Sequence, residues 1–189
     1  MKPGPLIILS GPSGSGKSTV LDQVIKTTTL PLRLSVSATT RRPRHGEQEG
    51  VHYYFWTPEQ FEREVKAGAF LEWAEVHGHR YGTLRKEVEP WRQQGMGVIL
   101  DIDVQGAIAV RRQIPEAVLV FMRTSAFETY EQRLRHRATE DEARIQERLA
   151  RARQELTRAS DYDFEVINDD LNVAVEKFHA ILRPLFERN

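Results

Sequence analysis

The sequence predicts an α/β protein with three layers, in which helices cover both faces of a parallel sheet. Short apolar runs typical of buried strands alternate with helical patterns along most of the chain. The strand runs are Leu6–Leu9, Leu32–Val36, Val98–Ile102, Val118–Met122 and, more weakly, Phe164–Ile167. The helical patterns cover residues 17–27, 58–67, 84–94, 103–113, 127–136, 141–160 and 171–187. In sheets of this kind, ligands bind beyond the carboxyl ends of the strands.

Composition and charge narrow the classes of protein to consider. A chain of 189 residues suits a single domain. It carries 27 basic and 27 acidic residues, so nothing global indicates nucleic acid or a membrane surface as a partner. Cysteine is absent, which excludes disulfides and thiolate zinc sites. No apolar stretch approaches the ~18–20 residues that span a bilayer, and we expect a cytoplasmic protein without a signal peptide.

The first strand leads into a glycine-rich loop that matches the G-x-x-x-x-G-K-[ST] pattern at residues 11–18. Its glycines allow successive backbone N–H groups to turn inward around phosphate oxygens. Lys17 would face the β- and γ-phosphates, Ser18 would offer a hydroxyl to Mg²⁺, and a helix would begin near Lys17 with its positive end toward the anion. A turn that binds nothing is the alternative. The pattern predicts a nucleoside triphosphate site formed by Gly11, Pro12, Ser13, Gly14, Ser15, Gly16, Lys17, Ser18 and Thr19.

A basic segment follows, because no acidic residue occurs between Gln23 and Gly46. Within it, Arg41 and Arg44 flank Pro43, which favours an extended backbone. Two guanidinium groups at this spacing can converge on one small anion. A solvated basic loop is the alternative.

Glu72 is a carboxylate within the apolar run Phe70-Leu71-Glu72-Trp73, where an unpaired charge would be costly. A surface position on a short strand would explain it. A ligand could also satisfy it, since a carboxylate accepts two parallel hydrogen bonds from the ring N–H and the amine of guanine. Adenine presents an acceptor at that ring nitrogen and would be repelled.

Two stretches depart from simple alternation. Residues 37–83 hold arginine, glycine and aromatic residues in short irregular pieces, which predicts a small mixed insertion with hairpins. Residues 123–160 are rich in both charges and helical in pattern, with little apolar stripe through 135–142. This second stretch predicts an exposed, mobile arm.

The motifs together resemble the guanylate kinases, in order and spacing, over nearly the whole chain. They are Gly11–Ser18, Ser35–Arg41, Pro43-Arg44, Gly46-Glu47, Tyr53, Phe70–Trp73, Tyr81–Thr83, Ile99–Asp103, Gln105-Gly106 and Ile167–Asp170. The resemblance implies a P-loop kinase core at approximately 1–36, 84–122 and 161–189. It also implies a GMP-binding insertion at approximately 37–83 and a lid at approximately 123–160. The implied reaction transfers the ATP γ-phosphoryl to GMP or dGMP, with Mg²⁺ as cofactor.

The resemblance also assigns residues to the two substrates. The implied guanine contacts are Ser37, Glu72 and Thr83. The implied contacts to the GMP phosphate are Arg41, Arg44, Tyr53 and Tyr81, although both tyrosines also suit packing roles. Asp101 and Asp103 are implied near GMP or Mg²⁺-bound water, with their individual roles open. Asn168 is implied near the adenine, and the cations around the transferred phosphoryl are Lys17, Arg41, Arg133, Arg137 and Arg148.

Some positions depart from the family pattern. His136 and Ala138 stand where glycines usually flank the lid arginine, Arg137, which puts the flexibility of the lid in doubt. His52 replaces a common Asp, and Arg80 replaces a frequent aromatic or polar residue, so both could alter GMP affinity. The pair His77-x-His79 lacks the further ligands that a zinc site needs.

Two other functions remain open beside a kinase for GMP. A catalytically inactive interaction module would be expected to have a degraded phosphate loop, whereas this loop is complete. A P-loop kinase for another monophosphate would share the loop but not the Glu72 and Thr83 pair. We expect a monomer or a weak homo-oligomer with small-molecule substrates.

Overall fold

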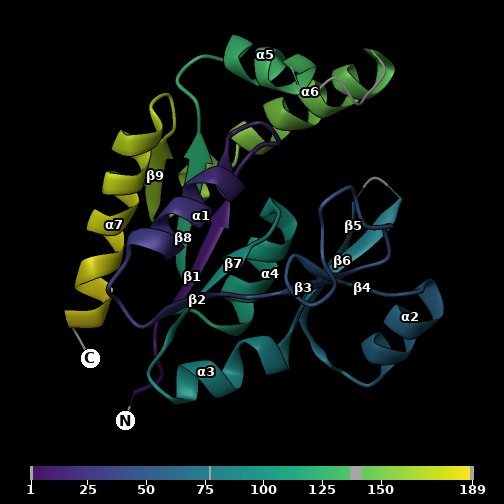
Figure 1. The fold of residues 1–189 in the computed structure, drawn as a ribbon, viewed down its shortest axis with the longest axis vertical. Helices are drawn as coiled ribbons and strands as arrows, with labels where there is room; N and C mark the ends of the chain where they lie inside the picture. Colours follow the sequence, from purple (N-terminus) through teal and green to yellow (C-terminus); the bar gives the residue numbers. More distant parts are fainter. Residues whose placement is uncertain (1, 77, 137–141, 188–189) are drawn as a thin grey trace.

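The computed structural model describes residues 2–76, 78–136 and 142–187 and arranges them as two sheets with flanking helices (Figure 1). Within these residues, no helix combines the length and apolar character that crossing a bilayer requires.

The larger sheet has five parallel strands in the order β2-β7-β1-β8-β9. Their bounds are β1 Leu6–Ser10, β2 Leu32–Leu34, β7 Gly97–Asp101, β8 Val118–Arg123 and β9 Phe164–Ile167. The central strand β1 pairs Leu6 with Val98 of β7 and Ile7 with Val118 of β8. With a strand on each edge and helices on each face, all five of its residues are buried. The α/β class with a parallel sheet is confirmed.

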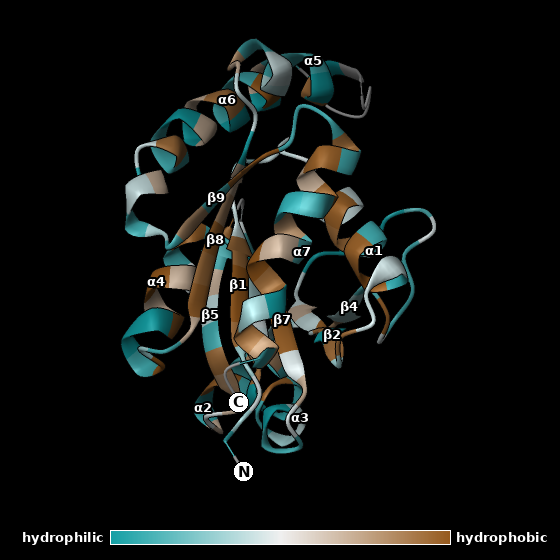
Figure 2. Cartoon of the chain, turned by 90° about the vertical axis from the view of Figure 1, so that its left-hand side faces the viewer, coloured by the Kyte–Doolittle hydropathy of each residue, from teal (hydrophilic) through white to brown (hydrophobic). Residues whose placement is uncertain are grey.

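Helices cover both faces of this sheet, as the hydropathy colouring shows (Figure 2). Ile7 and Leu9 of β1 pack with helices α1 Lys17–Thr27 and α7 Leu171–Glu187. Leu6 and Ile8 point to the other face, where they share a core with α4 Val104–Gln113. Successive strand residues alternate between faces, so one apolar run serves two cores.

The smaller sheet is mixed and has the order β4-β3-β6-β5. Its strands are β3 Ser37–Thr39, β4 Tyr53–Phe55, β5 Phe70–Val76 and β6 His79–Leu84, with α2 Pro58–Lys66 against them. Phe61 of α2 stacks on Phe70 of β5, with ring centroids 4.5 Å apart. This sheet therefore has an aromatic core of its own, separate from the larger sheet.

One buried carboxylate connects the two sheets. Glu87 lies just after the smaller sheet, and its Oε2 accepts a hydrogen bond from Arg33 of β2 at 2.7 Å. Its Oε1 accepts one from the Tyr54 hydroxyl of β4 at 2.9 Å. The Arg33 guanidinium also lies over the Trp91 ring, 4.1 Å from its centroid. Residues from both sheets thus converge on a single acid.

Helices α5 Glu128–His136 and α6 Glu142–Leu156 pack against each other at one end of the molecule (Figure 1). Tyr130 and Leu134 meet Ile145 and Leu149 in a small buried cluster. The charged 123–160 stretch therefore includes an apolar core that its composition conceals.

Several predicted bounds are wrong. The helix predicted over 84–94 is a 3₁₀ turn, η1 Arg85–Glu87, followed by a short helix, α3 Glu89–Gln93. Leu84 instead ends β6, and Pro90 in the first turn of α3 lacks the N–H that a continuous helix would use. The helix predicted over 141–160 ends at Leu156 before a second 3₁₀ turn, η2 Ala159–Asp161. Strand β2 stops at Leu34 rather than Val36.

Candidate active site

The glycine-rich loop connects β1 to α1 at the carboxyl end of the larger sheet. Gly11 has φ +149°, and a Cβ there would lie 2.0 Å from the Met122 carbonyl oxygen. Gly16 has φ +88°, and its Cβ would lie 2.3 Å from Asn168 Nδ2. No other residue type fits these two positions without rearrangement. The Lys17 ammonium folds back over the loop and donates to the Gly11 carbonyl oxygen at 2.7 Å.

Three polar side chains from distant parts of the chain hold this loop. Asn168 Nδ2 donates to the Ser15 carbonyl oxygen at 2.7 Å. Arg133 of α5 donates to the Gly14 carbonyl oxygen at 3.3 Å and to that of Asn168 at 2.9 Å. Arg148 of α6 donates to the Ser13 hydroxyl. The α5–α6 arm is thus in direct contact with the loop.

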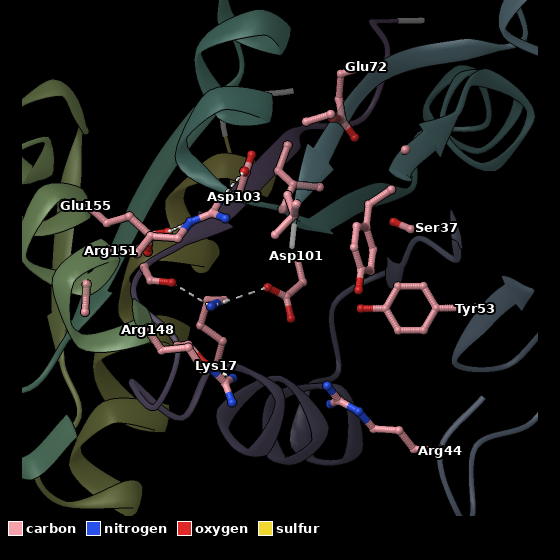
Figure 3. Close-up of a pocket in the computed structure, with 18 residues that line it drawn as sticks. Lys17, Ser37, Arg44, Tyr53, Glu72, Asp101, Asp103, Arg148, Arg151 and Glu155 are labelled. Atoms are coloured by element: carbon pink, nitrogen blue, oxygen red, sulfur yellow. Dashed lines mark hydrogen bonds and ion pairs between the residues drawn. The ribbon is translucent and has the colours of Figure 1, made fainter. Parts of the chain in front are cut away.

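A cavity of about 270 Å³ opens from the loop toward the smaller sheet. Gly11, Ser13 and Lys17 line one side, beside Asp101 at the end of β7 and Asp103 just after it. The smaller sheet and the loop between its strands β3 and β4 contribute Ser37, Arg44, Tyr53, Glu72 and Tyr81. Side chains from the two sheets face each other across this cavity (Figure 3).

Glu72 is nearly enclosed at the far end of the cavity, with 7% of its surface exposed. One oxygen accepts a hydrogen bond from the Thr83 backbone N–H at 2.9 Å. Burial raises the pKa of the Glu72 carboxyl to about 7, against the opposing effect of the Thr83 bond. The buried Thr83 hydroxyl beside it has no hydrogen-bond partner within the described part of the chain. A buried hydroxyl of this kind needs a partner, which water or a polar ligand can supply.

The two carboxylates at the end of β7 and just after it, Asp101 and Asp103, have different partners. Asp101 lies 4.0 Å from the Lys17 ammonium. Burial raises the pKa of Asp101, and the Lys17 charge opposes that effect. Asp103 caps α4 by accepting the Gly106 N–H at 2.8 Å. Its second oxygen pairs with Arg151 of α6 at 3.0 Å.

Arg41 is not among the residues that line this cavity. Its guanidinium forms two parallel bonds with Glu47, both 2.6 Å long. That bond is the main reason why the pKa of Glu47 is lowered to about 2 and the pKa of Arg41 is raised. The Arg44 backbone N–H also donates to Glu47, at 2.7 Å. Arg41 and Arg44 nevertheless meet in a neighbouring hollow of about 400 Å³, together with Tyr81 and Arg148.

Tyr53 and Tyr81 lie side by side, with ring centroids 6.0 Å apart. Burial raises the pKa of the Tyr53 hydroxyl to about 12, so this group keeps its proton at neutral pH and can donate a hydrogen bond. Arg41 lies over the Tyr53 ring, 5.0 Å from its centroid. The two tyrosine rings thus pack against each other and also line the cavity.

Comparison with known proteins identifies the family. The family model described as guanylate kinase matches residues 4–185. The chain belongs to the guanylate kinase family. The guanylate kinase of Fusobacterium nucleatum is 48% identical over 96% of this chain and 97% of its own length. That of Rubrobacter xylanophilus is 46% identical over 98% and 96%. A solved guanylate kinase structure from Anaplasma phagocytophilum is 32% identical, with a TM-score of 0.80 over 97% of this chain and 87% of that one.

The structure brings most of the residues implied by the guanylate kinase resemblance into two adjoining spaces. The main cavity and the hollow beside Arg41 hold those implied for GMP, apart from Thr83, which bonds to Glu72 from behind. A separate open pocket of about 590 Å³ is lined by Gly14, Gly16, Thr19, Arg133 and Asn168. Ser18 is exposed in the first turn of α1. Arg137, Ala138 and His77 lie outside the described residues, as does the side chain of His136.

The two departures next to the tyrosines point away from the guanylate kinase cavity. Arg80 pairs with Glu62 of α2 at 2.6 Å. His52 Nδ1 accepts the Gln48 backbone N–H at 3.1 Å. Neither residue lines the cavity, so any effect on GMP affinity would be indirect.

Two charged residues of the cavity were missed by the sequence reasoning. Arg151 and Glu155 lie on α6 and line the cavity together with Arg148. Their spacing of three and seven residues from Arg148 places all three on one helix face. That periodicity was a usable signal, but the density of charges on this helix obscured it.

Proposed function

We propose that this protein catalyses the reversible, Mg²⁺-dependent transfer of the ATP γ-phosphoryl to GMP, giving ADP and GDP. The family membership carries the reaction class, ATP:GMP phosphotransfer. The observation that supports it in this chain is the single cavity between Lys17 of the phosphate loop and Glu72 of the smaller sheet. A donor and an acceptor bound at these two ends would meet in the middle. The reaction would serve purine nucleotide metabolism, including GMP recycling, in the cytoplasm.

The acceptor side supplies base and phosphate recognition. Ionised Glu72 would accept the ring N–H and the amine of guanine, and the Thr83 hydroxyl and Ser37 would bond to the same base. Arg44, Tyr53 and Tyr81 would hold the GMP phosphate. Arg41 would join them through the adjacent hollow, with its guanidinium kept in place by Glu47. No residue assigned here recognises the 2′-hydroxyl, so dGMP is also expected to be a substrate.

The donor side supplies positive charge around the transferring group. The loop from Gly11 to Thr19 would cradle the ATP phosphates, and the Lys17 ammonium would leave the Gly11 carbonyl for the β- and γ-phosphates. Arg148 and Arg133 already contact this loop and would neutralise charge that develops in transfer. We assign the same role to Arg137. Asn168 would lie near the adenine.

The residues fit a metal that arrives with the nucleotide. Among the described residues, no cluster of three or more acidic or histidine side chains could hold an ion unaided. The exposed Ser18 hydroxyl would share Mg²⁺ with phosphate oxygens, and Asp101 would orient its water. When bound, Mg²⁺ neutralises phosphate charge. No general base is required, because the attacking GMP oxygen is largely deprotonated at neutral pH.

A coupled ADP-release assay with Mg-ATP and GMP, dGMP, AMP, CMP and UMP tests this function. We expect strong turnover with GMP and weaker turnover with dGMP. Turnover with another monophosphate would retain the transfer mechanism and overturn the Glu72 assignment. GMP binding without turnover of any acceptor would favour an interaction module instead.

A further inference from the structure

Helix α6 reaches from the phosphate loop to the GMP side of the cavity. Arg148 contacts Ser13 of the loop, and one turn later Arg151 contacts Asp103 after β7. Glu155, one further turn along, lines the same cavity. Figure 3 shows these three side chains projecting from α6 toward the space between the sheets. One helix face therefore touches the donor and acceptor sides at different residues.

Arg151 has two carboxylate partners. Its Nη2 lies 3.0 Å from Asp103 Oδ2, and its Nε lies 3.0 Å from Glu155 Oε1. The side chains are largely enclosed, with exposed fractions of 26% for Arg151, 20% for Asp103 and 16% for Glu155. Since Asp103 Oδ1 accepts the Gly106 N–H, both oxygens of Asp103 are engaged. Arg151 thus fixes the orientation of this carboxylate.

The contacts of Arg151 would affect GMP binding through the charge of the cavity. Four carboxylates line it, from Glu72, Asp101, Asp103 and Glu155, although the expected ligands are anions. Lys17 faces Asp101, whereas Arg151 bonds both Asp103 and Glu155. Removing the Arg151 charge would leave two carboxylates near the acceptor without that partner. It would also release α6 from its contact with the residues after β7.

We propose that Arg151 is a positioning residue for GMP, which acts by holding the Asp103 carboxylate and by tying α6 to the acceptor side of the cavity. The inference rests on the proposed function, because Asp103 lines the cavity in which GMP would bind. ATP binding is affected little, because the contact between α6 and the phosphate loop is made by Arg148. An ion pair that only stabilises the fold would instead affect both substrates alike.

Steady-state rates of the full chain with Arg151→Met test this role, with GMP and Mg-ATP varied in turn. We expect KM for GMP to rise about fivefold, as for the loss of a partly buried ion pair, while KM for ATP and kcat stay within about twofold. Arg151→Lys keeps the charge and should recover part of the GMP affinity. Arg153→Met is the matched control, since Arg153 points outward on α6 over the Phe127 ring. It should match the wild type.

A double-mutant cycle with Asp103→Asn identifies the partner. If Arg151 acts through Asp103, Arg151→Met should add less than about twofold to KM for GMP in the Asp103→Asn background. If the effects of Arg151→Met and Asp103→Asn on KM for GMP multiply in the double variant, the two residues act independently and the proposal is overturned. So would an Arg151→Met protein that binds GMP as the wild type does, or one that weakens GMP and ATP equally and unfolds at lower denaturant. If the wild type does not phosphorylate GMP, the proposed function is refuted, but the role of Arg151 can still be tested. Calorimetry then measures the GMP affinity of the same variants.

Discussion

A single residue, Glu72, carries the clearest conflict between folding and binding. Its carboxyl is buried with one backbone N–H as partner, and burial raises its pKa to about 7. Holding it ionised costs free energy of folding, which a ligand with two donor groups would offset.

Replacement of Glu72 by Gln should therefore separate binding from stability. In the proposed function the ionised form would bind guanine, so KM for GMP in the wild type should fall as pH rises through about 7. Glu72→Gln should show a much higher KM for GMP, which should not fall in this way as pH rises. Its KM for ATP should be nearly unchanged. Because the GMP phosphate itself titrates near pH ~6, the difference between the two proteins is the quantity to measure.

The same substitution should stabilise the protein at high pH. A carboxyl with a raised folded-state pKa binds more protons folded than unfolded between its two pKa values. The wild type should then lose stability as pH rises from 4.5 toward 7, and Glu72→Gln should not. Urea unfolding gives the difference in free energy of unfolding between Glu72→Gln and the wild type. This difference should shift in favour of the variant by up to about 2–3 kcal/mol between pH 4 and pH 8. If the difference in free energy of unfolding were the same from pH 4 to pH 8, ionisation of Glu72 would not destabilise the folded protein.

At the residue scale, the sequence singles out a side chain that contradicts its surroundings, and the structure buries that side chain, whereas its contact with guanine stays a prediction. Glu72 was identifiable because a charge interrupts an apolar run. The Arg41–Glu47 pair was not, since both residues are ordinary members of a charged segment. Their bidentate contact depends on a turn whose geometry the sequence does not specify.

At the scale of elements, helix α4 approaches Glu72 closely. A Cβ on Gly106 would lie 2.7 Å from Glu72 Oε2. The glycine N–H also bonds Asp103. Helix α4 thus requires a glycine because it packs against the cavity wall.

Gly106→Ala should impair GMP binding more than it impairs folding. The displaced atom is the flexible end of Glu72, so the carboxylate can move, and alanine favours the helix by about 1 kcal/mol. We expect KM for GMP to rise about tenfold, with the free energy of unfolding within about 1 kcal/mol of the wild type. The exposed neighbour Gln105 provides the control, as Gln105→Ala should leave KM unchanged. An unchanged KM in Gly106→Ala would mean that Glu72 tolerates displacement.

Element prediction failed mainly where tertiary contacts decide the boundary. Residues 84–94 have a helical pattern, yet pairing with β5 extends β6 through Leu84. The small core between α5 and α6 was likewise hidden, because its apolar residues are separated by many charges.

At the scale of the whole molecule, the buried acid Glu87 joins the two sheets that form the cavity. Its side chain is 10% exposed and that of Arg33 is 22% exposed. The relative placement of donor and acceptor sides therefore depends partly on one buried ion pair.

Glu87→Ala should destabilise the protein by about 2–4 kcal/mol, because it leaves the Arg33 charge without its buried partner. Urea unfolding measures this, and KM for GMP should rise as well if the sheets shift. Glu89→Ala is the control, since Glu89 belongs to an exposed pair with Arg85. That pair should contribute less than about 1 kcal/mol. Equal effects of the two substitutions would contradict a special role for Glu87.

The larger sheet was predictable from the alternation of strands and helices. A strand that is covered by helices on both faces forms a continuous apolar run, and such runs are easy to recognise in the sequence. The smaller sheet was predictable only as an irregular insertion. Its parallel β3–β4 pair and bulged β5–β6 pair depend on long-range packing around Phe61 and Phe70 rather than on local pattern.

The position of β1 at the centre of its sheet has a consequence during synthesis. Leu6 pairs with Val98, and Ile7 pairs with Val118, so this strand finds both partners only after most of the chain has been made. Until then, its apolar side chains lack their native neighbours on the ribosome, and the nascent protein is exposed to aggregation. The strand that leads into the phosphate loop is therefore the segment for which chaperones would matter most.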